Sequence, residues 1–158
     1  MAWRGTTTVQ ERIFACLPYL LPLMHGFAFG VFLLREFPVL QYLFLPLIPL
    51  LQIYSSIPFA SLIVFFALYL LVVRNESISH FIRFNTMQAI LIDIVIFLCG
   101  LVLPILAPIP GASFAMQTIA STIFLGIVAS VAFAVTQSLR GKYAEIPALS
   151  DAVHMQVR

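Results

Sequence analysis

Charged side chains are scarce in this sequence of 158 residues. Asp, Glu, Lys and Arg make up 9% of it, against roughly 25% in an ordinary soluble domain, while hydrophobic residues make up 62%. A water-soluble fold cannot hide that much apolar surface. The few charges fall in narrow clusters between long uncharged stretches, which is typical of segments that cross hydrocarbon. The composition therefore predicts a single domain that is embedded in the lipid bilayer.

The sequence also lacks the residue clusters on which chemistry depends. Cys16 and Cys99 both fall in apolar segments, where a thiol acts as a small hydrophobe. Metal-spaced His and Cys clusters, phosphate-binding glycine loops, nucleophile elbows and paired carboxylates do not occur. The net charge of +2 is too small for a nucleic-acid surface. We predict no enzyme activity, no cofactor, no metal and no nucleic-acid partner.

A cleavable targeting segment is not expected at the amino terminus. Arg4 and Arg12 precede the first apolar run, but this run is longer than the core of a signal peptide. No small-residue cleavage pattern follows it before Arg35, and no Arg-rich and Ser-rich transit peptide precedes it. We expect the protein to be made in the compartment whose membrane it enters.

Four apolar stretches predict membrane-spanning helices. A helix needs about 20 residues to cross about 30 Å of hydrocarbon, and we predict spans at 13–34, 57–73, 85–103 and 114–135. Prolines break up 37–55, so we predict an interfacial or re-entrant segment there, with Tyr42 and Tyr54 as interface anchors. The polar tail at 140–158 is expected to be a loosely ordered terminus.

The basic residues predict the orientation in the membrane. With four spans, all of the 8 Lys and Arg residues except Arg35 lie on one side. Because cytoplasmic loops carry the excess of Lys and Arg, both termini are expected in the cytoplasm or the plastid stroma. A fifth span at 37–55 would weaken this bias without removing it.

Polar residues gather on one face of the third predicted span. Asp93 is the only carboxylate within a predicted span. Because a charged side chain in lipid is costly, we expect Asp93 to face protein or water. Asp93 could line a polar path or fasten helices together, and we favour fastening, as we do for His25. Spacing leaves open whether these two residues touch. The predicted polar intramembrane face consists of Arg83, Asn85, Thr86, Gln88, Asp93 and His25.

Small residues recur at helical spacing in the first and fourth spans. They form a GxxxG pair in the first span and repeat every four positions in the fourth. Such faces let helix backbones approach closely. We interpret them mainly as packing within the bundle, with a dimer seam as the alternative. The predicted packing residues are Gly26, Gly30, Gly100, Thr122, Gly126, Ser130 and Ala134.

Several stretches of the sequence resemble a known family. The stretch RFNTMQAILID at 83–93, preceded by SHFI and by PFASLIVFFALYLLVVRN, is similar to the Tic-twenty family. That family is the membrane subunit of the protein translocon at the chloroplast inner envelope, with cyanobacterial and plastid-encoded relatives. ERIFACLPYLLPL and PLIPLLQIYSSIPFAS fit the same pattern, so the resemblance covers roughly 11–136. The sequence departs from the family pattern at His25, because the family often has an acidic residue just before the glycine that is Gly26 here.

The resemblance implies a four-helix subunit of a preprotein-conducting complex. Its partners would be other membrane translocon subunits or further copies of itself, with preproteins as substrates. The membrane would be the cyanobacterial plasma or thylakoid membrane, or the plastid inner envelope. Two other functions fit the residues. A small-solute or ion carrier would lose flux on Asp93→Asn, whereas a non-conducting scaffold or assembly factor would tolerate Asp93→Asn but not Gly126→Leu.

Overall fold

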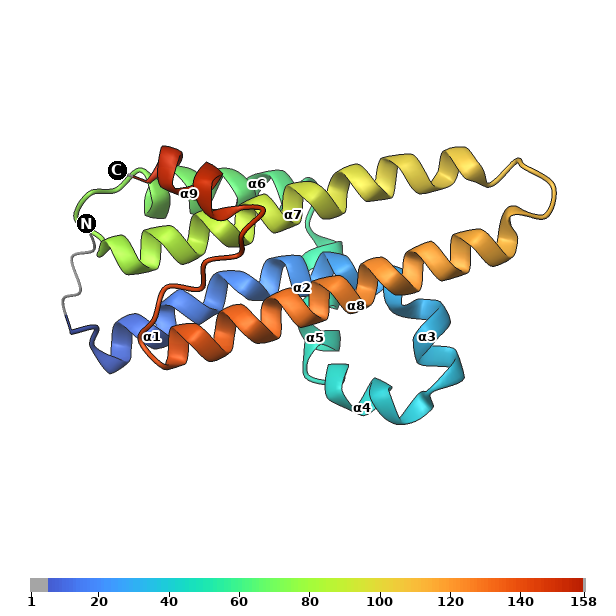
Figure 1. Ribbon diagram of the computed structural model, residues 1–158, viewed down its shortest axis with the longest axis horizontal. Helices are drawn as coiled ribbons and strands as arrows, with labels where there is room; N and C mark the ends of the chain where they lie inside the picture. The colour runs from blue at the N-terminus through green and yellow to red at the C-terminus, as the bar shows by residue number, and fades with distance from the viewer. Residues whose placement is uncertain (1–5, 158) are drawn as a thin grey trace.

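The fold is built on three long helical rods in a computed structural model that describes residues 6–157 (Figure 1). Two of them, α7 (His80–Leu106) and α8 (Ala112–Leu139), form an antiparallel hairpin. The first rod, Val9–Glu36, lies against this hairpin. All three are long and apolar enough to cross a bilayer, and the described residues contain no strand. The predicted all-α membrane fold is confirmed.

Prolines divide the first rod into segments of different helix type. Pro18 and Pro22 have no backbone N–H, so the regular hydrogen bonds of an α-helix are interrupted there. Neighbouring helices and short 3₁₀ turns make such breaks tolerable in a membrane. The rod begins at a capping box, in which the Thr8 hydroxyl accepts a hydrogen bond from the backbone N–H of Glu11 (3.2 Å). Its segments are α1 (Val9–Cys16), η1 (Leu17–Tyr19), α2 (Leu20–Gly26), η2 (Phe27–Gly30) and α3 (Val31–Glu36).

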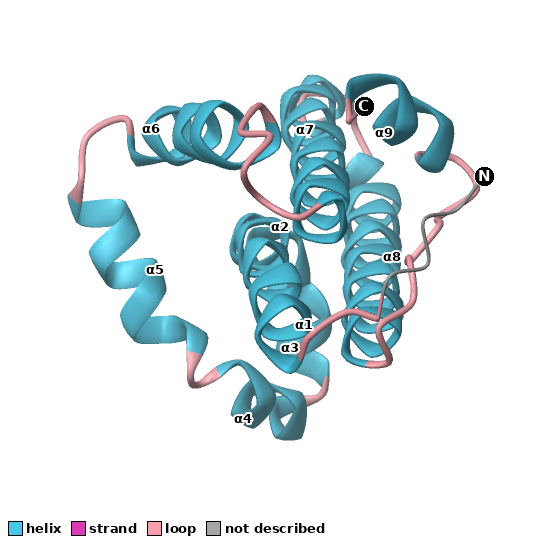
Figure 2. Cartoon of the chain, turned by 90° about the vertical axis from the view of Figure 1, so that its left-hand side faces the viewer, coloured by secondary structure: helices cyan, strands magenta, loops and turns pink. Residues whose placement is uncertain are grey.

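A bent helical segment follows the first rod. The helices over Pro38–Phe44 and Leu47–Ser56 meet at an angle of 68°. In both views the second of them runs across the long axis of the rods (Figures 1 and 2). Counting this bent pair as one span raises the candidate spans of the described chain from 3 to 4. The segments are η3 (Pro38–Leu40), α4 (Gln41–Phe44) and α5 (Leu47–Ser56).

The helix that returns towards the termini is shorter than the span predicted at 57–73. It joins the 8 residues of α6 (Ala60–Ala67) to the 6 residues of the π-helical segment η4 (Leu68–Val73). It begins only at Ala60 because Phe59 has a left-handed backbone, with φ 57°. At about 1.5 Å per residue, these residues cover about 21 Å, which is less than the hydrocarbon thickness of about 30 Å.

Both hairpin helices extend past the spans predicted at 85–103 and 114–135. Hydropathy marks only the apolar part of a helix, so the polar first turn of α7 lies outside the predicted span. The turn between the two helices ends at Gly111, whose φ of 79° suits a residue without a side chain. Large apolar side chains cover the outer surface of the hairpin, among them Phe97, Ile105 and Phe114. This surface suits contact with lipid rather than with water.

The described part of the carboxyl-terminal tail, 140–157, folds onto the bundle, so the expectation of a loosely ordered terminus at 140–158 was wrong there; Arg158 lies outside the described residues. Helix α9 (Ser150–Gln156) packs against α7 near the amino-terminal end of that helix (Figure 1). Val153 is 0% exposed and Val157 is 2% exposed. The polar composition of the tail gave no sign of this packing, because a few buried apolar side chains such as Val153 and Val157 are enough to attach a short helix.

His80 and Tyr143 attach the tail to the start of α7. The two ring nitrogens of His80 contact the Tyr143 hydroxyl at 3.0 Å and the Val157 carbonyl at 3.3 Å. The Tyr143 ring also packs edge-on against Phe81 and Phe84. Burial raises the pKa of the Tyr143 phenol above its ordinary value. His80, whose side chain is exposed, thus joins the tail to the first turn of α7.

Candidate functional site

A buried polar network joins the first rod to both hairpin helices. The Asn85 side-chain oxygen accepts hydrogen bonds from the hydroxyls of Tyr19 and Ser138, each at 2.9 Å. Its amide nitrogen donates to the Phe81 carbonyl at 2.9 Å. The side-chain amide of Gln88 donates to the Tyr19 hydroxyl, also at 2.9 Å. Asn85 is therefore the centre of the network, with Tyr19 on the first rod and Ser138 on α8.

The members of this network are closed off from the outside. Asn85, Gln88 and Ser138 are 0% exposed, and Tyr19 is 1% exposed. The Gln88 side-chain oxygen is buried without a hydrogen-bond partner. Side chains that are sealed and bonded to each other hold helices together, because a buried polar group without its partner costs free energy. The geometry around Asn85 is therefore that of side chains holding helices together.

Arg83 and Thr86 lie beside this network and donate hydrogen bonds to backbone carbonyls. The Arg83 Nε donates to the Val73 carbonyl at 2.8 Å, at the carboxyl-terminal end of η4. A cation suits this position because the last carbonyls of a helix lack partners and carry partial negative charge. The Thr86 hydroxyl donates to the carbonyl of Ile82 in its own helix at 2.9 Å. Arg83 therefore fastens the short helix to α7.

Asp93 and His25 meet farther along α7, at the boundary between α2 and α7. The His25 Nδ1 lies 2.5 Å from the Asp93 Oδ1. The His25 side chain is 25% exposed and the Asp93 side chain is 12% exposed, so neither is sealed. The Tyr54 ring of α5 lies edge-on to the His25 ring, with centroids 5.3 Å apart. The buried Tyr54 hydroxyl has no hydrogen-bond partner, which is a placement unlike that of the expected interface anchor.

The His25–Asp93 pair lines a cavity of about 550 Å³, which we call the paired cavity. Helix α6 forms its opposite wall, where the Ser61 hydroxyl is the polar group. Its volume is in the range of small-ligand pockets, which are about 300–1,000 Å³. The aromatic side chains that line it are Phe29, Phe65, Phe66 and Phe97.

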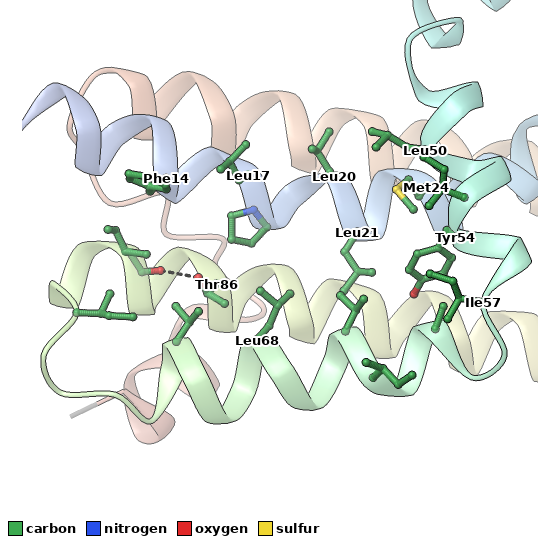
Figure 3. A pocket seen from close by; sticks show the side chains of 18 residues that line it. Phe14, Leu17, Leu20, Leu21, Met24, Leu50, Tyr54, Ile57, Leu68 and Thr86 are labelled. Carbon is green, nitrogen blue, oxygen red and sulfur yellow. Dashed lines mark hydrogen bonds between the residues drawn. The ribbon is translucent and has the colours of Figure 1, made fainter.

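A second cavity, of about 680 Å³, lies between the first rod and the α6–η4 helix (Figure 3). We call it the apolar cleft, since aliphatic and aromatic side chains make up nearly all of its lining. Tyr54 stands at one end of it, and Thr86 lies on its α7 wall (Figure 3). Helix α6 therefore stands between two cavities, and in the end-on view it lies apart from the first rod (Figure 2).

Gly26 and Gly30 bring the first rod against α8. A Cβ atom on Gly26 would lie 2.9 Å from the Ile127 side chain, and one on Gly30 would lie 2.6 Å from the Phe124 ring. Both distances are too short for real Cβ contacts. Gly100 borders the paired cavity, where a Cβ would meet the Phe29 ring at an ordinary 3.8 Å.

The small-residue stripe of α8 only partly faces the bundle. Ala134 is buried and Ser130 is partly buried, but Thr122 and Gly126 are exposed. A Cβ on Gly126 would meet no atom within 4 Å. The stripe drifts because each four-residue step advances about 40° beyond a full turn. The packed face instead alternates steps of four and three residues, at Ala120, Phe124, Ile127, Val131, Ala134 and Ser138.

Metal ligation has no support in the described part of the chain. Between residues 6 and 157, no group of three or more His, Cys, Asp or Glu side chains could hold a metal ion. Cys16 and Cys99 are both free thiols. The interactions that the site does show are hydrogen bonds and the His25–Asp93 contact, in apolar surroundings.

Comparison with known proteins decides the family. The family model for the Tic20-like chloroplast import apparatus matches residues 8–153. The chain belongs to the Tic20 family. This finding confirms the resemblance to the Tic-twenty family that the motifs carried.

Relatives of this Tic20-family chain occur in cyanobacteria and plastids. A Tic20 family protein of Synechocystis sp. is 49% identical over 159 residues, covering 100% of this chain and 99% of the relative. The protein TIC 20-II, chloroplastic, of Arabidopsis thaliana is 37% identical over 96% of this chain and 74% of its own length. The Tic20 family protein Ycf60 of Gracilaria tenuistipitata var. liui is 35% identical, with coverages of 95% and 76%.

Three residues of the site were missed by the sequence analysis. Tyr19 and Ser138 complete the network around Asn85, and Tyr54 stands beside the His25–Asp93 pair. Tyr19 is a hydroxyl-bearing residue in an otherwise apolar run, which is a signal for an interhelical hydrogen bond. Ser138 lies four residues past Ala134 and extends the same small-residue stripe. Tyr54 offered no such signal, because a tyrosine near a proline-broken segment is more typical of an interface anchor.

Proposed function

We propose that this Tic20-family protein is a membrane subunit of a preprotein-translocating complex and acts by assembling with other subunits. The match to the import-apparatus family over residues 8–153 is the observation that carries the proposal. Its partners are then other membrane subunits or a second copy, with preproteins as substrates and no nucleic acid. We also propose that it catalyses no reaction, as the sparse chemistry of the sequence supports.

The internal polar residues support assembly over a channel within one chain. A conducting path for a polypeptide needs a lumen lined by polar groups or water. Here the side-chain amides of Asn85 and Gln88 are fully buried, and both bond to the Tyr19 hydroxyl. The two cavities lie on either side of α6 and have mostly apolar walls. A path for a preprotein would then form between subunits.

The placement of the chain ends supports a location for both termini on the cytoplasmic or stromal side. Figure 1 shows α1, α9 and the start of α7 at the same end of the bundle. Arg12, Arg74 and Lys142 lie in the segments at this end, as the rule for cytoplasmic Lys and Arg requires. We propose the cyanobacterial plasma or thylakoid membrane, or the plastid inner envelope, in line with the origins of the relatives.

The experiment is affinity purification of the tagged protein from native membranes that carry an arrested preprotein. We expect the preprotein and at least one other membrane subunit in the purified complex. Purified protein in bilayers should also bind the preprotein. If the protein binds no preprotein and brings down no partner, the proposal fails.

The His25–Asp93 pair favours a second candidate function, a small-solute or ion carrier. An ionisable residue inside a membrane domain that borders a cavity often marks a transport path. For a carrier, Asp93→Asn should abolish flux in liposomes. For the translocation subunit, flux of small solutes should be absent from the wild type as well.

A further inference from the structure

Asp93 presents an unused hydrogen-bond acceptor to the paired cavity. One carboxylate oxygen is taken by the His25 Nδ1. Among residues 6–157, no other donor bonds to this carboxylate. The side chain keeps 12% of its surface exposed, and it lines the cavity of about 550 Å³. An acceptor left without a donor in apolar surroundings is costly, so a ligand that supplies the donor would be favoured.

The imidazole of His25 narrows the chemistry of that ligand. In the neutral imidazole, with Nδ1–H donated to the carboxylate, the other ring nitrogen is an acceptor. Nε2 has no hydrogen-bond partner in the described chain. With the imidazole neutral and the carboxylate ionised, the polar end of the cavity offers acceptors and a negative charge. Such a site excludes anions and selects a group that donates hydrogen bonds and carries positive charge.

The walls of the cavity fit the same ligand. Four phenylalanine rings line it, and the faces of aromatic rings attract cations. Phe66 is 53% exposed and Phe97 is 64% exposed, so the cavity opens sideways on the lipid-facing surface. A ligand that enters from this side must carry an apolar body. A plain acyl chain would fill the space but would leave the Asp93 oxygen unpaired.

We propose that the paired cavity binds a primary ammonium or guanidinium group carried on an apolar body, with Asp93 as the anion and the phenylalanine rings as the walls. Two sources share this chemistry: a small lipophilic amine, and a Lys or Arg side chain in an apolar polypeptide segment. The binding site does not depend on the translocation proposal, and it can be tested with the purified protein alone.

The test follows 4-fluorophenethylammonium by ¹⁹F NMR as the purified protein is added in phosphatidylcholine nanodiscs. The wild type should shift the signal saturably beyond the effect of empty nanodiscs. The uncharged isostere 2-(4-fluorophenyl)ethanol should bind at least about tenfold more weakly, because it lacks the charge that pairs with a carboxylate. Equal binding of the ammonium and the alcohol would overturn the proposal.

Matched variants locate the binding. Asp93→Asn should weaken binding of the ammonium at least about tenfold. Glu76→Gln also replaces a carboxylate by an amide, but at an exposed loop position, and should have no effect. Ser61→Phe keeps the carboxylate and the helix contacts but fills the cavity from an exposed position, so it should also abolish saturable binding. If Ser61→Phe and Asp93→Asn both fold and bind like the wild type, the site is elsewhere and the proposal is wrong.

Competition distinguishes the two sources of the cation. Apolar host peptides with one central Lys or one central Gln are added to the probe complex. If the Lys peptide displaces the probe and the Gln peptide does not, the site binds polypeptide side chains. Saturable binding of the probe without displacement by either peptide assigns it to small amines. Displacement by the Gln peptide to the same extent as by the Lys peptide would contradict recognition of a cation.

Discussion

Asn85 connects the three rods through a single buried side chain. Its oxygen accepts from two helices at once, so its loss strands two hydroxyls in the interior. An interhelical hydrogen bond in a membrane protein contributes about 0.6 kcal/mol to stability on average and about 1.7 kcal/mol at most. The network therefore stabilises the fold modestly but sets how the three rods fit together.

Asn85→Ala should lower the free energy of unfolding by about 1–2 kcal/mol, because two interhelical bonds are lost and the Tyr19 and Ser138 hydroxyls remain buried. Reversible unfolding in mixed detergent micelles measures the change. Gln117→Ala removes an amide from the exposed face of α8 and should change stability by less than about 0.5 kcal/mol. Equal effects of the two substitutions would contradict a stabilising role for the network.

Tyr143 gives the tail a dependence on pH. Because its folded-state pKa is raised, the neutral phenol stabilises the attached tail fully below the ordinary pKa of about 10. This stabilisation is lost as the pH rises through the folded-state pKa. A spin label on the exposed face of α9, at Asp151→Cys, should gain mobility above about pH 10. The step should be absent in Tyr143→Phe, and its persistence there would assign it to another group.

The elements differ in how far sequence alone could predict them. Hydropathy located the three rods, because an apolar run of about 20 residues has few alternatives in lipid. It misjudged their ends, since polar first turns such as that of α7 read as loops. It also overestimated the α6–η4 helix, because the left-handed Phe59 backbone is not visible in composition. The meeting of His25 and Asp93, 68 positions apart, depends on packing and could not be derived from spacing.

At the level of helix packing, Gly30 and Gly126 form a matched pair. Both are glycines in helices, but a Cβ on Gly30 meets the Phe124 ring at 2.6 Å, whereas a Cβ on Gly126 meets nothing within 4 Å. Gly30→Ala should therefore destabilise the bundle by about 1–3 kcal/mol through overpacking. Gly126→Ala should be neutral or stabilise it by up to about 1 kcal/mol, because alanine favours a helix. Thermal unfolding in detergent measures both, and the reverse order would contradict the packing of the first rod on α8.

For the whole molecule, the exposed small-residue face of α8 is where assembly is expected. Thr122 and Gly126 are exposed in the single chain, so helices of a partner could approach closely there. Gly126→Leu should leave the stability of the isolated protein unchanged but reduce the recovery of partner subunits several-fold on affinity purification. Unchanged recovery would place the assembly surface elsewhere.

We propose that this Tic20-family chain acts in preprotein translocation as part of an assembly. Chemical crosslinking followed by mass spectrometry, on native membranes with a preprotein arrested in transit, tests it most directly. We expect crosslinks from this chain both to a second membrane subunit and to the arrested preprotein. Crosslinks confined to lipid-embedded proteins unrelated to translocation, with none to the preprotein, would contradict it.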